Sequence, residues 1–201
     1  MGCDSSKQKS PNKQDALKIK ETEKQTKKTI EAKIVLLGEQ NVGKSSIAQR
    51  YCKNSFSEQH AATIGGAYLN QKVQLKNGEY VNLHIWDTGG QERFRAMAGL
   101  YYKDAAAAIL TYDVTTQNSL ESLNYWIKEL KNNASSENII LCLAGNKCDV
   151  PQQNRKLQFN DGKNFAQQNN MIFYETSAKN DIGIKELFTA LANKIYENSN
   201  K

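Results

Sequence analysis

The chain has 201 residues, of which 39% are hydrophobic and 24% are charged. This length and composition allow one globular domain with a tail, and they exclude a wholly disordered chain. The apolar runs at 105–110 and 139–145 fall far short of the roughly 18 residues that a membrane span needs, so we expect none. The four cysteines contain no CxxC pair, which predicts neither a disulfide framework nor a zinc site.

The net charge of +6 is concentrated near the amino terminus. Residues 1–33 hold nine lysines against five acidic residues, whereas the other 168 residues hold 18 basic and 16 acidic residues. This near balance in the globular part argues against nucleic acid as a partner. Residues 1–32 are predicted to be a basic, disordered arm, and the lack of an apolar segment after Met1 predicts no secretory signal.

From residue 33 onward, apolar runs alternate with segments of helical spacing. Buried strands are expected at 33–37, 81–86, 105–112, 139–144 and 171–174, and amphipathic helices at 119–131 and 184–196. Asn77-Gly78 predicts a hairpin between 67–75 and 79–86. We therefore expect an α/β domain at 33–197, followed by a short polar end at 198–201. Its doubly wound, mostly parallel six-stranded sheet has one antiparallel edge strand and helices on both faces.

A phosphate-binding loop follows the first predicted strand. Residues 38–45 match GxxxxGK[ST] between a strand and a helix, which is the setting that this motif requires. Its backbone N–H groups and the helix N-terminus bind phosphate, Lys44 adds a charge, and the Ser45 hydroxyl binds Mg²⁺. The predicted phosphate-binding residues are Gln40, Asn41, Val42, Gly43, Lys44, Ser45 and Ser46. The motif alone leaves ATPases, kinases and GTPases open.

Two later strands end in residues that can recognise guanine. Asn146-Lys147-Cys148-Asp149 follows one strand, and the Asp149 carboxylate can accept hydrogen bonds from N1–H and the exocyclic amine of guanine. Ser177-Ala178-Lys179 follows the next strand, where its backbone can meet the guanine carbonyl. These residues predict GTP and GDP as ligands and disfavour an ATPase or a small-molecule kinase.

A fourth motif, Asp87-Thr88-Gly89-Gly90, closes the 81–86 strand. At a strand end beside the phosphate loop, Asp87 can hold Mg²⁺ and the Gly90 N–H can sense a γ-phosphate. Gln91 is placed to orient the attacking water, so Gln91 and Lys44 are the predicted catalytic residues.

The sequence resembles the Ras-like small GTPases and, within them, the Rab family. The resemblance covers residues 33 to about 196 and rests on 86–94, Tyr101-Tyr102, 112–115 and 175–179; Ala67-Tyr68-Leu69 and 125–130 resemble the early-endosomal branch. It implies a monomeric switch on endosomal or related vesicle membranes that hydrolyses GTP, slowly without an activating protein. The implied partners are an exchange factor, an activating protein and the effectors that the switch recruits in vesicle trafficking.

The resemblance also implies roles for single residues. Thr63, 19 residues after Lys44, would cap Mg²⁺ and the γ-phosphate together with Ser45 and Asp87, and Phe56 would stack on guanine. Tyr68, Trp86 and Tyr101 match the aromatic triad that contacts effectors. Gly89 stands where the family usually has alanine, and Gln40 where it has a small or acidic residue. Both departures keep open an alternative, a GTP-binding membrane scaffold that hydrolyses slowly or not at all.

The resemblance directs attention to a membrane anchor. Rab proteins typically end in prenylated cysteines, but Tyr196 to Lys201 contain none, so no prenyl anchor is expected. Gly2 and Ser6 fit the M-G-x-x-x-[ST] myristoylation pattern, and Cys3 is placed for palmitoylation. We therefore expect acyl chains at Gly2 and Cys3, as in N-terminally acylated Rab proteins of plants and protists, on the cytoplasmic face of the membrane with a cytosolic pool.

Overall fold

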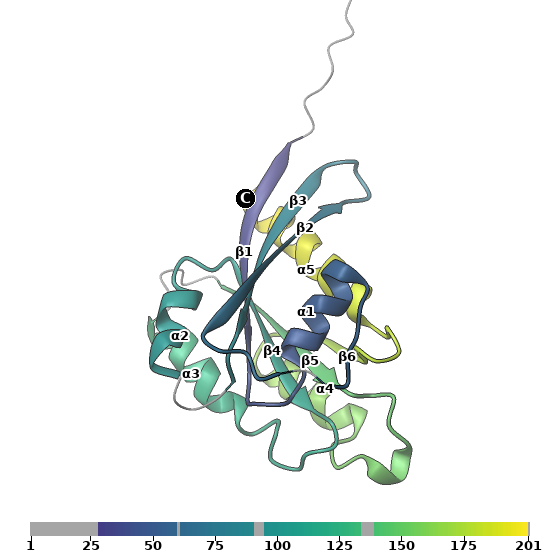
Figure 1. Cartoon of the computed structure of the whole chain (residues 1–201). Coiled ribbons are helices and arrows are strands. Elements are labelled where there is room, and N and C mark those ends of the chain that lie inside the picture. Colours follow the sequence, from purple (N-terminus) through teal and green to yellow (C-terminus); the bar gives the residue numbers. More distant parts are fainter. Residues whose placement is uncertain (1–27, 60, 91–94, 134–138, 201) are drawn as a thin grey trace, which may run out of the picture.

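A computed structural model describes residues 28–59, 61–90, 95–133 and 139–200. These residues form one six-stranded sheet with the order β2-β3-β1-β4-β5-β6 (Figure 1). The strands are β1 (Thr29–Leu37), β2 (Gly66–Gln74), β3 (Tyr80–Thr88), β4 (Ala107–Asp113), β5 (Ile140–Asn146) and β6 (Ile172–Thr176). Neighbouring strands are parallel except β2 and β3. The predicted sheet with one antiparallel edge strand is confirmed.

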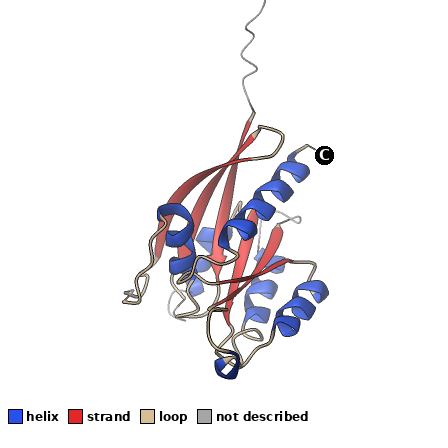
Figure 2. Ribbon diagram, turned by 90° about the vertical axis from the view of Figure 1, so that its right-hand side faces the viewer, coloured by secondary structure: helices blue, strands red, loops and turns tan. Residues whose placement is uncertain are grey.

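Helices cover both faces of the sheet (Figure 2), as predicted. They are α1 (Lys44–Lys53), α2 (Arg95–Tyr102), α3 (Leu123–Asn133), α4 (Phe159–Gln168), α5 (Ile184–Ser199) and the short 3-10 helix η3 (Gln152–Asn154). Side chains alternate across each strand, so Ile34 and Leu36 pack with α1 and α5, whereas Val35 and Leu37 pack with α2, α3 and α4. One apolar run of β1 therefore supplies two cores.

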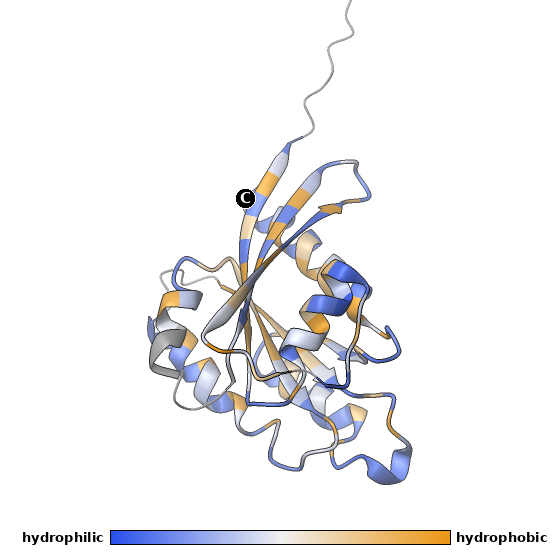
Figure 3. Cartoon of the chain, viewed as in Figure 1, coloured by the Kyte–Doolittle hydropathy of each residue, from blue (hydrophilic) through white to orange (hydrophobic). Residues whose placement is uncertain are grey.

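Apolar residues are concentrated in the strands and in the helix faces packed on them, and the loop with η3 is polar (Figure 3). Seven successive residues of β4 are buried, as expected for a strand that is covered on both faces. On one face the Phe188 ring stacks on Tyr51 with centroids 3.8 Å apart, and on the other Trp126 is fully buried. None of the helices in the described ranges has the length and apolar character that a membrane span requires.

Two elements start four residues from the predicted position, whereas the other predicted elements start within two residues of it. β1 begins at Thr29 instead of Lys33, because Thr29 to Ala32 pair with β3 and Ala32 is buried. α3 begins at Leu123 instead of Ser119, because the Ser119 hydroxyl accepts a hydrogen bond of 2.9 Å from the Asp113 N–H and residues 119–122 form a turn. Serine often competes for backbone partners in this way and so delays a helix.

The parallel strands bring the sequence motifs to one edge of the sheet. Leu36 pairs with Asp87 at the ends of β1 and β3. At the ends of β4, β5 and β6, Asp113 pairs with Asn146, and Asn146 pairs with Thr176. The loops that follow these strands therefore lie side by side, at the carboxyl edge where ligands bind in such folds.

Candidate functional site

A cavity of about 470 Å³ lies at this carboxyl edge. The predicted residues that line it are Gln40, Asn41, Gly43, Lys44, Ser45, Ser46, Phe56, Thr63, Gly90, Asn146, Lys147, Asp149, Ala178 and Lys179. Val42, Asp87 and Ser177, also predicted, are buried and do not line it. The predicted catalytic Gln91 and the predicted lipidation sites Gly2 and Cys3 lie outside the described residues.

Glycines allow the phosphate-binding loop to pack closely against its neighbours. Gly38 and Gly43 have φ angles of +141° and +97°, which other residues rarely adopt. A Cβ atom on Gly38 would lie 2.3 Å from the Thr111 carbonyl oxygen, and one on Gly43 would lie 2.1 Å from Asn146 Nδ2. α1 then begins at Lys44 without a side-chain cap or an acidic residue in its first turn, so its N-terminal N–H groups can bind an anion.

The Lys44 ammonium lies in the bend of this loop and is only 4% exposed. Its Nζ donates hydrogen bonds of 2.9 and 2.8 Å to the carbonyl oxygens of Gly38 and Glu39. Burial lowers the pKa of Lys44 to about 8, although the carboxylates of Asp87 and Glu39 act in the opposite direction. A phosphate in the cavity would favour the charged form, so the site is suited to a polyanion.

Three oxygen-bearing side chains from different elements meet beside Lys44. Ser45 Oγ on α1 lies 2.8 Å from Thr63 Oγ1, and Thr63 Oγ1 lies 3.5 Å from Asp87 Oδ2 at the end of β3. Hydroxyl and carboxylate oxygens are the ligands that Mg²⁺ prefers, and phosphate oxygens commonly complete its shell. The donor set therefore fits Mg²⁺ held together with a nucleotide. Within the described ranges, no group of three or more His, Cys, Asp and Glu residues could hold a metal.

The end of β3 is packed directly on the phosphate loop. The Thr88 hydroxyl donates a 2.7 Å hydrogen bond to the Leu36 carbonyl. A Cβ atom on Gly90 would lie 2.5 Å from both the Glu39 carbonyl oxygen and Lys44 Nζ, so only glycine fits. The segment that leads to Gln91 therefore starts in contact with the phosphate-binding loop.

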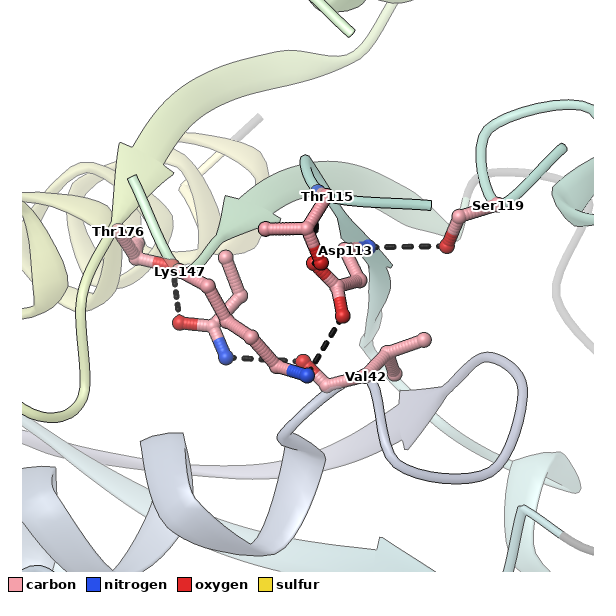
Figure 4. A network of polar contacts seen from close by, with 7 residues as sticks. Val42, Asp113, Thr115, Ser119, Lys147 and Thr176 are labelled. Atoms are coloured by element: carbon pink, nitrogen blue, oxygen red, sulfur yellow. Dashed lines mark hydrogen bonds and ion pairs between the residues drawn. The ribbon is translucent and has the colours of Figure 1, made fainter. Parts of the chain in front are cut away.

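The loop after β5 joins the phosphate loop to the opposite wall of the cavity (Figure 4). Asn146 Nδ2 donates a 2.8 Å hydrogen bond to the Val42 carbonyl, and Asn146 Oδ1 accepts one of 3.3 Å from the Thr176 hydroxyl. Lys147 has a φ of +65°, and its Nζ forms a 2.5 Å ion pair with Asp113 Oδ2. One amide thus joins the phosphate loop to the ends of β5 and β6.

The loop after β6 completes the wall that the sequence assigns to guanine. Arg50 on α1 donates hydrogen bonds of 2.8 and 3.2 Å to the carbonyl oxygens of Ala178 and Lys179. At the rim, Lys179 Nζ lies 2.8 Å from Glu58 Oε1. This bond raises the pKa of Lys179 and lowers that of Glu58. Arg50 therefore fixes the position of this loop, and Glu58 adds only an ion pair between exposed side chains.

Several site residues were missed by the sequence reasoning. Those that line the cavity are Ser57, Glu58, Ala61, Ala62, Thr88 and Val150. Most lie between Phe56 and Thr63, so their only available signal was their position between two predicted residues. Behind the wall, both terminal nitrogens of Arg155 bind the two carboxylate oxygens of Glu175, one of them at 3.1 Å. This ion pair joins the loop after Asp149 to β6, and no motif marks it.

The predicted aromatic triad is assembled outside the cavity. The ring centroids of Tyr68 and Trp86 lie 5.5 Å apart, and those of Trp86 and Tyr101 lie 5.9 Å apart. Tyr68 is 52% exposed, and its hydroxyl lies 2.6 Å from His84 Nδ1. His84 Nε2 in turn lies 2.6 Å from a carboxylate oxygen of Glu31 on β1. The rings form a continuous surface, and their effector role stays a prediction.

Comparisons with known proteins agree with this geometry. Residues 33–197 match the Ras family. Ras-related protein Rab-5B of Plasmodium falciparum is 45% identical, with 98% of this chain and 94% of that protein covered. GTP-binding protein ypt5 of Schizosaccharomyces pombe is 45% identical over 83% of this chain and 79% of its own length. Ras-related protein Rab-21 of Bos taurus is 41% identical over 85% of this chain and 75% of its own length.

The family match covers the residues that build the cavity, and the relatives share the Rab character that the motifs predict. The resemblance stated from the sequence is thus confirmed. The chain belongs to the Ras family of small GTPases and is a Rab-type GTPase.

Proposed function

We propose that this Rab-type protein is a Mg²⁺-dependent GTP/GDP switch that acts on endosomal or related vesicle membranes. The observation that carries the proposal is the 2.8 Å contact of Ser45 Oγ with Thr63 Oγ1 beside Asp87. Thr63 lies in the loop before β2, so a ligand that binds these oxygens also orders this loop. Because β2 carries Tyr68 of the triad, the state of the ligand can be read at the surface.

At the phosphate end of the cavity, Lys44 and the N–H groups of residues 40–46 bind the β- and γ-phosphates. Bound Mg²⁺ would be held by Ser45, Thr63 and Asp87 and would neutralise charge that develops on the phosphates. Gly90 contacts the γ-phosphate, and Gln91 orients the water. The buried position of the Lys44 ammonium, held by the carbonyl oxygens of Gly38 and Glu39, supports this assignment.

At the other end of the cavity, Asp149 accepts two hydrogen bonds from guanine, and the backbone at Ser177 to Lys179 meets its carbonyl. Phe56 and the stem of Lys147 lie on the walls between which the base fits. The Asn146 bond to Val42 supports this arrangement, because it keeps the base-binding end at a constant distance from the phosphate loop.

The chain is proposed to reach its membrane through myristate on Gly2 and palmitate on Cys3. A single myristoyl chain binds only marginally, so the second acyl chain and the lysines of residues 1–33 provide the remaining affinity. An exchange factor loads GTP, an activating protein accelerates hydrolysis, and effectors bind the triad of Tyr68, Trp86 and Tyr101. The domain acts as a monomer.

Removing the Ser45 hydroxyl tests the metal part of the proposal. In wild type, chelation of Mg²⁺ should accelerate GDP dissociation. In Ser45→Ala we expect dissociation in Mg²⁺ to be at least about tenfold faster than in wild type, since one ligand of the ion is lost. Release of a fluorescent GDP analogue measures both rates. Ser199→Ala, at the end of α5 and outside the cavity lining, should behave as wild type. If chelation of Mg²⁺ accelerated GDP dissociation from Ser45→Ala as much as from wild type, the assignment would be contradicted.

Base recognition is tested by Asp149→Asn. The new amide turns a donor toward the 2-amine of guanine, so affinity for GDP should fall by about a hundredfold or more. Xanthine has a carbonyl at this position, and affinity for its nucleotide should rise. Titration calorimetry with both nucleotides measures the two changes. Asp104→Asn, on the surface away from the cavity, serves as the control. If Asp149→Asn kept its guanine preference, another residue would read the base.

Hydrolysis is tested in single-turnover assays with Gln91→Leu. We expect wild type to cleave GTP slowly, and Gln91→Leu to be at least about tenfold slower still, because the water loses its orienting group. Nucleotide affinity should stay unchanged. If wild type shows no cleavage and Gln91→Leu is the same, the alternative of a GTP-binding scaffold without hydrolysis is correct.

The anchor is tested by imaging and fractionating cells that express tagged variants. Gly2→Ala should release the protein to the cytosol, whereas Cys3→Ser should leave it weakly held or on other membranes. Ser5→Ala keeps the M-G-x-x-x-S pattern and should localise as wild type. Retention of Gly2→Ala on membranes would show that the anchor lies elsewhere.

A further inference from the structure

A row of polar side chains continues the aromatic triad along one face of the sheet. The first five residues of β1, Thr29 to Lys33, pair with β3 and not with β4. Within this extension of β1, Glu31 lies opposite Asn82 on β3. The next two residues of β3 on the same face are His84 and Trp86, because side chains two residues apart on a strand share a face. The polar row and the triad therefore form one surface.

Hydrogen bonds connect Glu31 to the triad through His84. His84 Nε2 lies 2.6 Å from Glu31 Oε2, and His84 Nδ1 lies 2.6 Å from the Tyr68 hydroxyl. Asn82 Nδ2 donates a further hydrogen bond of 2.6 Å to Glu31 Oε2. The hydrogen bonds from His84 and Asn82 lower the pKa of Glu31, so this group is an ionised carboxylate at neutral pH. We call Glu31, His84 and Tyr68 the relay.

The carboxylate of Glu31 sets the direction of both hydrogen bonds in the relay. An ionised carboxylate only accepts hydrogen bonds, so a neutral His84 ring must carry its proton on Nε2. Its Nδ1 is then an acceptor, and the Tyr68 hydroxyl donates its proton to this nitrogen. Asn70 Nδ2, 3.5 Å from the Tyr68 oxygen, is too distant for a strong hydrogen bond. Tyr68 therefore presents an acceptor, and not a donor, to a molecule that approaches from solvent.

The surroundings of the relay determine which partner fits this acceptor. Tyr68 is 52% exposed and its ring packs against Trp86, so a partner meets an apolar surface that carries one oriented oxygen. Lys72 acts on the charge of Glu31, and Lys33 Nζ lies 5.5 Å from the centre of the Trp86 ring. These lysines offset the charge of Glu31, so the surface does not call for a cationic partner.

We infer that the relay makes Tyr68 a specificity-determining residue for effectors. It selects an apolar protein segment that places an N–H donor, such as the side chain of tryptophan, asparagine or glutamine, opposite the hydroxyl oxygen. His84 and Glu31 act as positioning residues, because they fix the polarity of the hydroxyl without needing to touch the partner. This inference rests on the proposed effector role of the triad and deepens it.

The position of the imidazole proton tests the relay without any partner. Nitrogen NMR of ring-labelled histidine at pH 8 distinguishes the two tautomers in the protein loaded with a GTP analogue that is not hydrolysed. His60→Gln assigns the signals, because the chain has two histidines. We expect the proton on Nε2 of His84 in wild type. In Glu31→Lys the new ammonium group only donates, so the proton should move to Nδ1.

The matched control for this measurement is Glu121→Lys, which makes the same charge change at another exposed glutamate. It should keep the tautomer of wild type. A proton on Nδ1 in wild type, or the same tautomer in wild type and Glu31→Lys, would overturn the inference.

Displayed peptides test the chemistry of the partner. A random peptide library is selected on the GTP-analogue form, and peptides that do not bind Tyr68→Ala are kept. Tyr68→Phe should weaken their binding by about fivefold, because one hydrogen bond is lost. An alanine scan on both proteins identifies the peptide residue whose effect disappears in Tyr68→Phe, and we expect an N–H donor there. An aspartate or glutamate at that position, or full affinity for Tyr68→Phe, would overturn the inference.

Nucleotide dependence separates this inference from the proposed function. Titration calorimetry measures the affinity of the selected peptides for the GDP form and for the GTP-analogue form. Equal affinities would refute the effector role of the triad, whereas the tautomer of His84 and the peptide residue opposite Tyr68 would still decide the inference. A preference for the GTP-analogue form together with a proton on Nδ1 in wild type would refute the relay and leave the switch intact.

Discussion

The site depends on one buried hydrogen bond, the 2.8 Å contact from Asn146 Nδ2 to the Val42 carbonyl. Val42 lies in the phosphate loop, and Asn146 is the last residue of β5. The same amide accepts from Thr176 on β6, so one side chain relates the phosphate loop to both base-binding loops. All three groups are buried, and a loss of any partner would leave an unpaired polar group in a dry environment. These bonds therefore set the separation between the two ends of the cavity.

The loop that carries Thr63 is held less firmly than the base-binding end of the cavity. Thr63 reaches the oxygen cluster from a loop, through contacts of 2.8 and 3.5 Å between partly buried hydroxyl and carboxylate groups. Glu58 in the same loop forms an ion pair with Lys179 between exposed groups, and such pairs contribute little. A rigid base-binding end and a loosely held Thr63 loop are the two parts that a switch needs, because a ligand can reorder only what is weakly held without it.

The sequence predicted the parts of this protein that depend on local pattern. The run Ile34 to Leu37 predicts a strand buried on both faces, and the motifs around Lys44, Asp87 and Asn146 predict which strand ends carry chemistry. It did not predict the start of β1, because Thr29 to Ala32 gain their place from pairing with β3, a long-range contact. The Arg155–Glu175 ion pair could not be predicted for the same reason. Its two residues lie in different elements and belong to no motif.

The extension of β1 links two features that look unrelated in the sequence. Glu31 lies on the extension and binds His84, which contacts the Tyr68 hydroxyl of the triad. Lys28, three residues earlier, is tied to the end of α5. A strand that began at Lys33, as the apolar run predicts, would leave His84 without Glu31 and would free the arm from the domain. The additional paired residues of β1 therefore have two effects. They order the edge of the triad, and they fix the point at which the chain enters the fold. Because the strand is stiff and its pairing partners are specified along its whole length, the direction of β1 alone determines that Thr29 and the nucleotide-binding cavity lie at opposite ends of the strand.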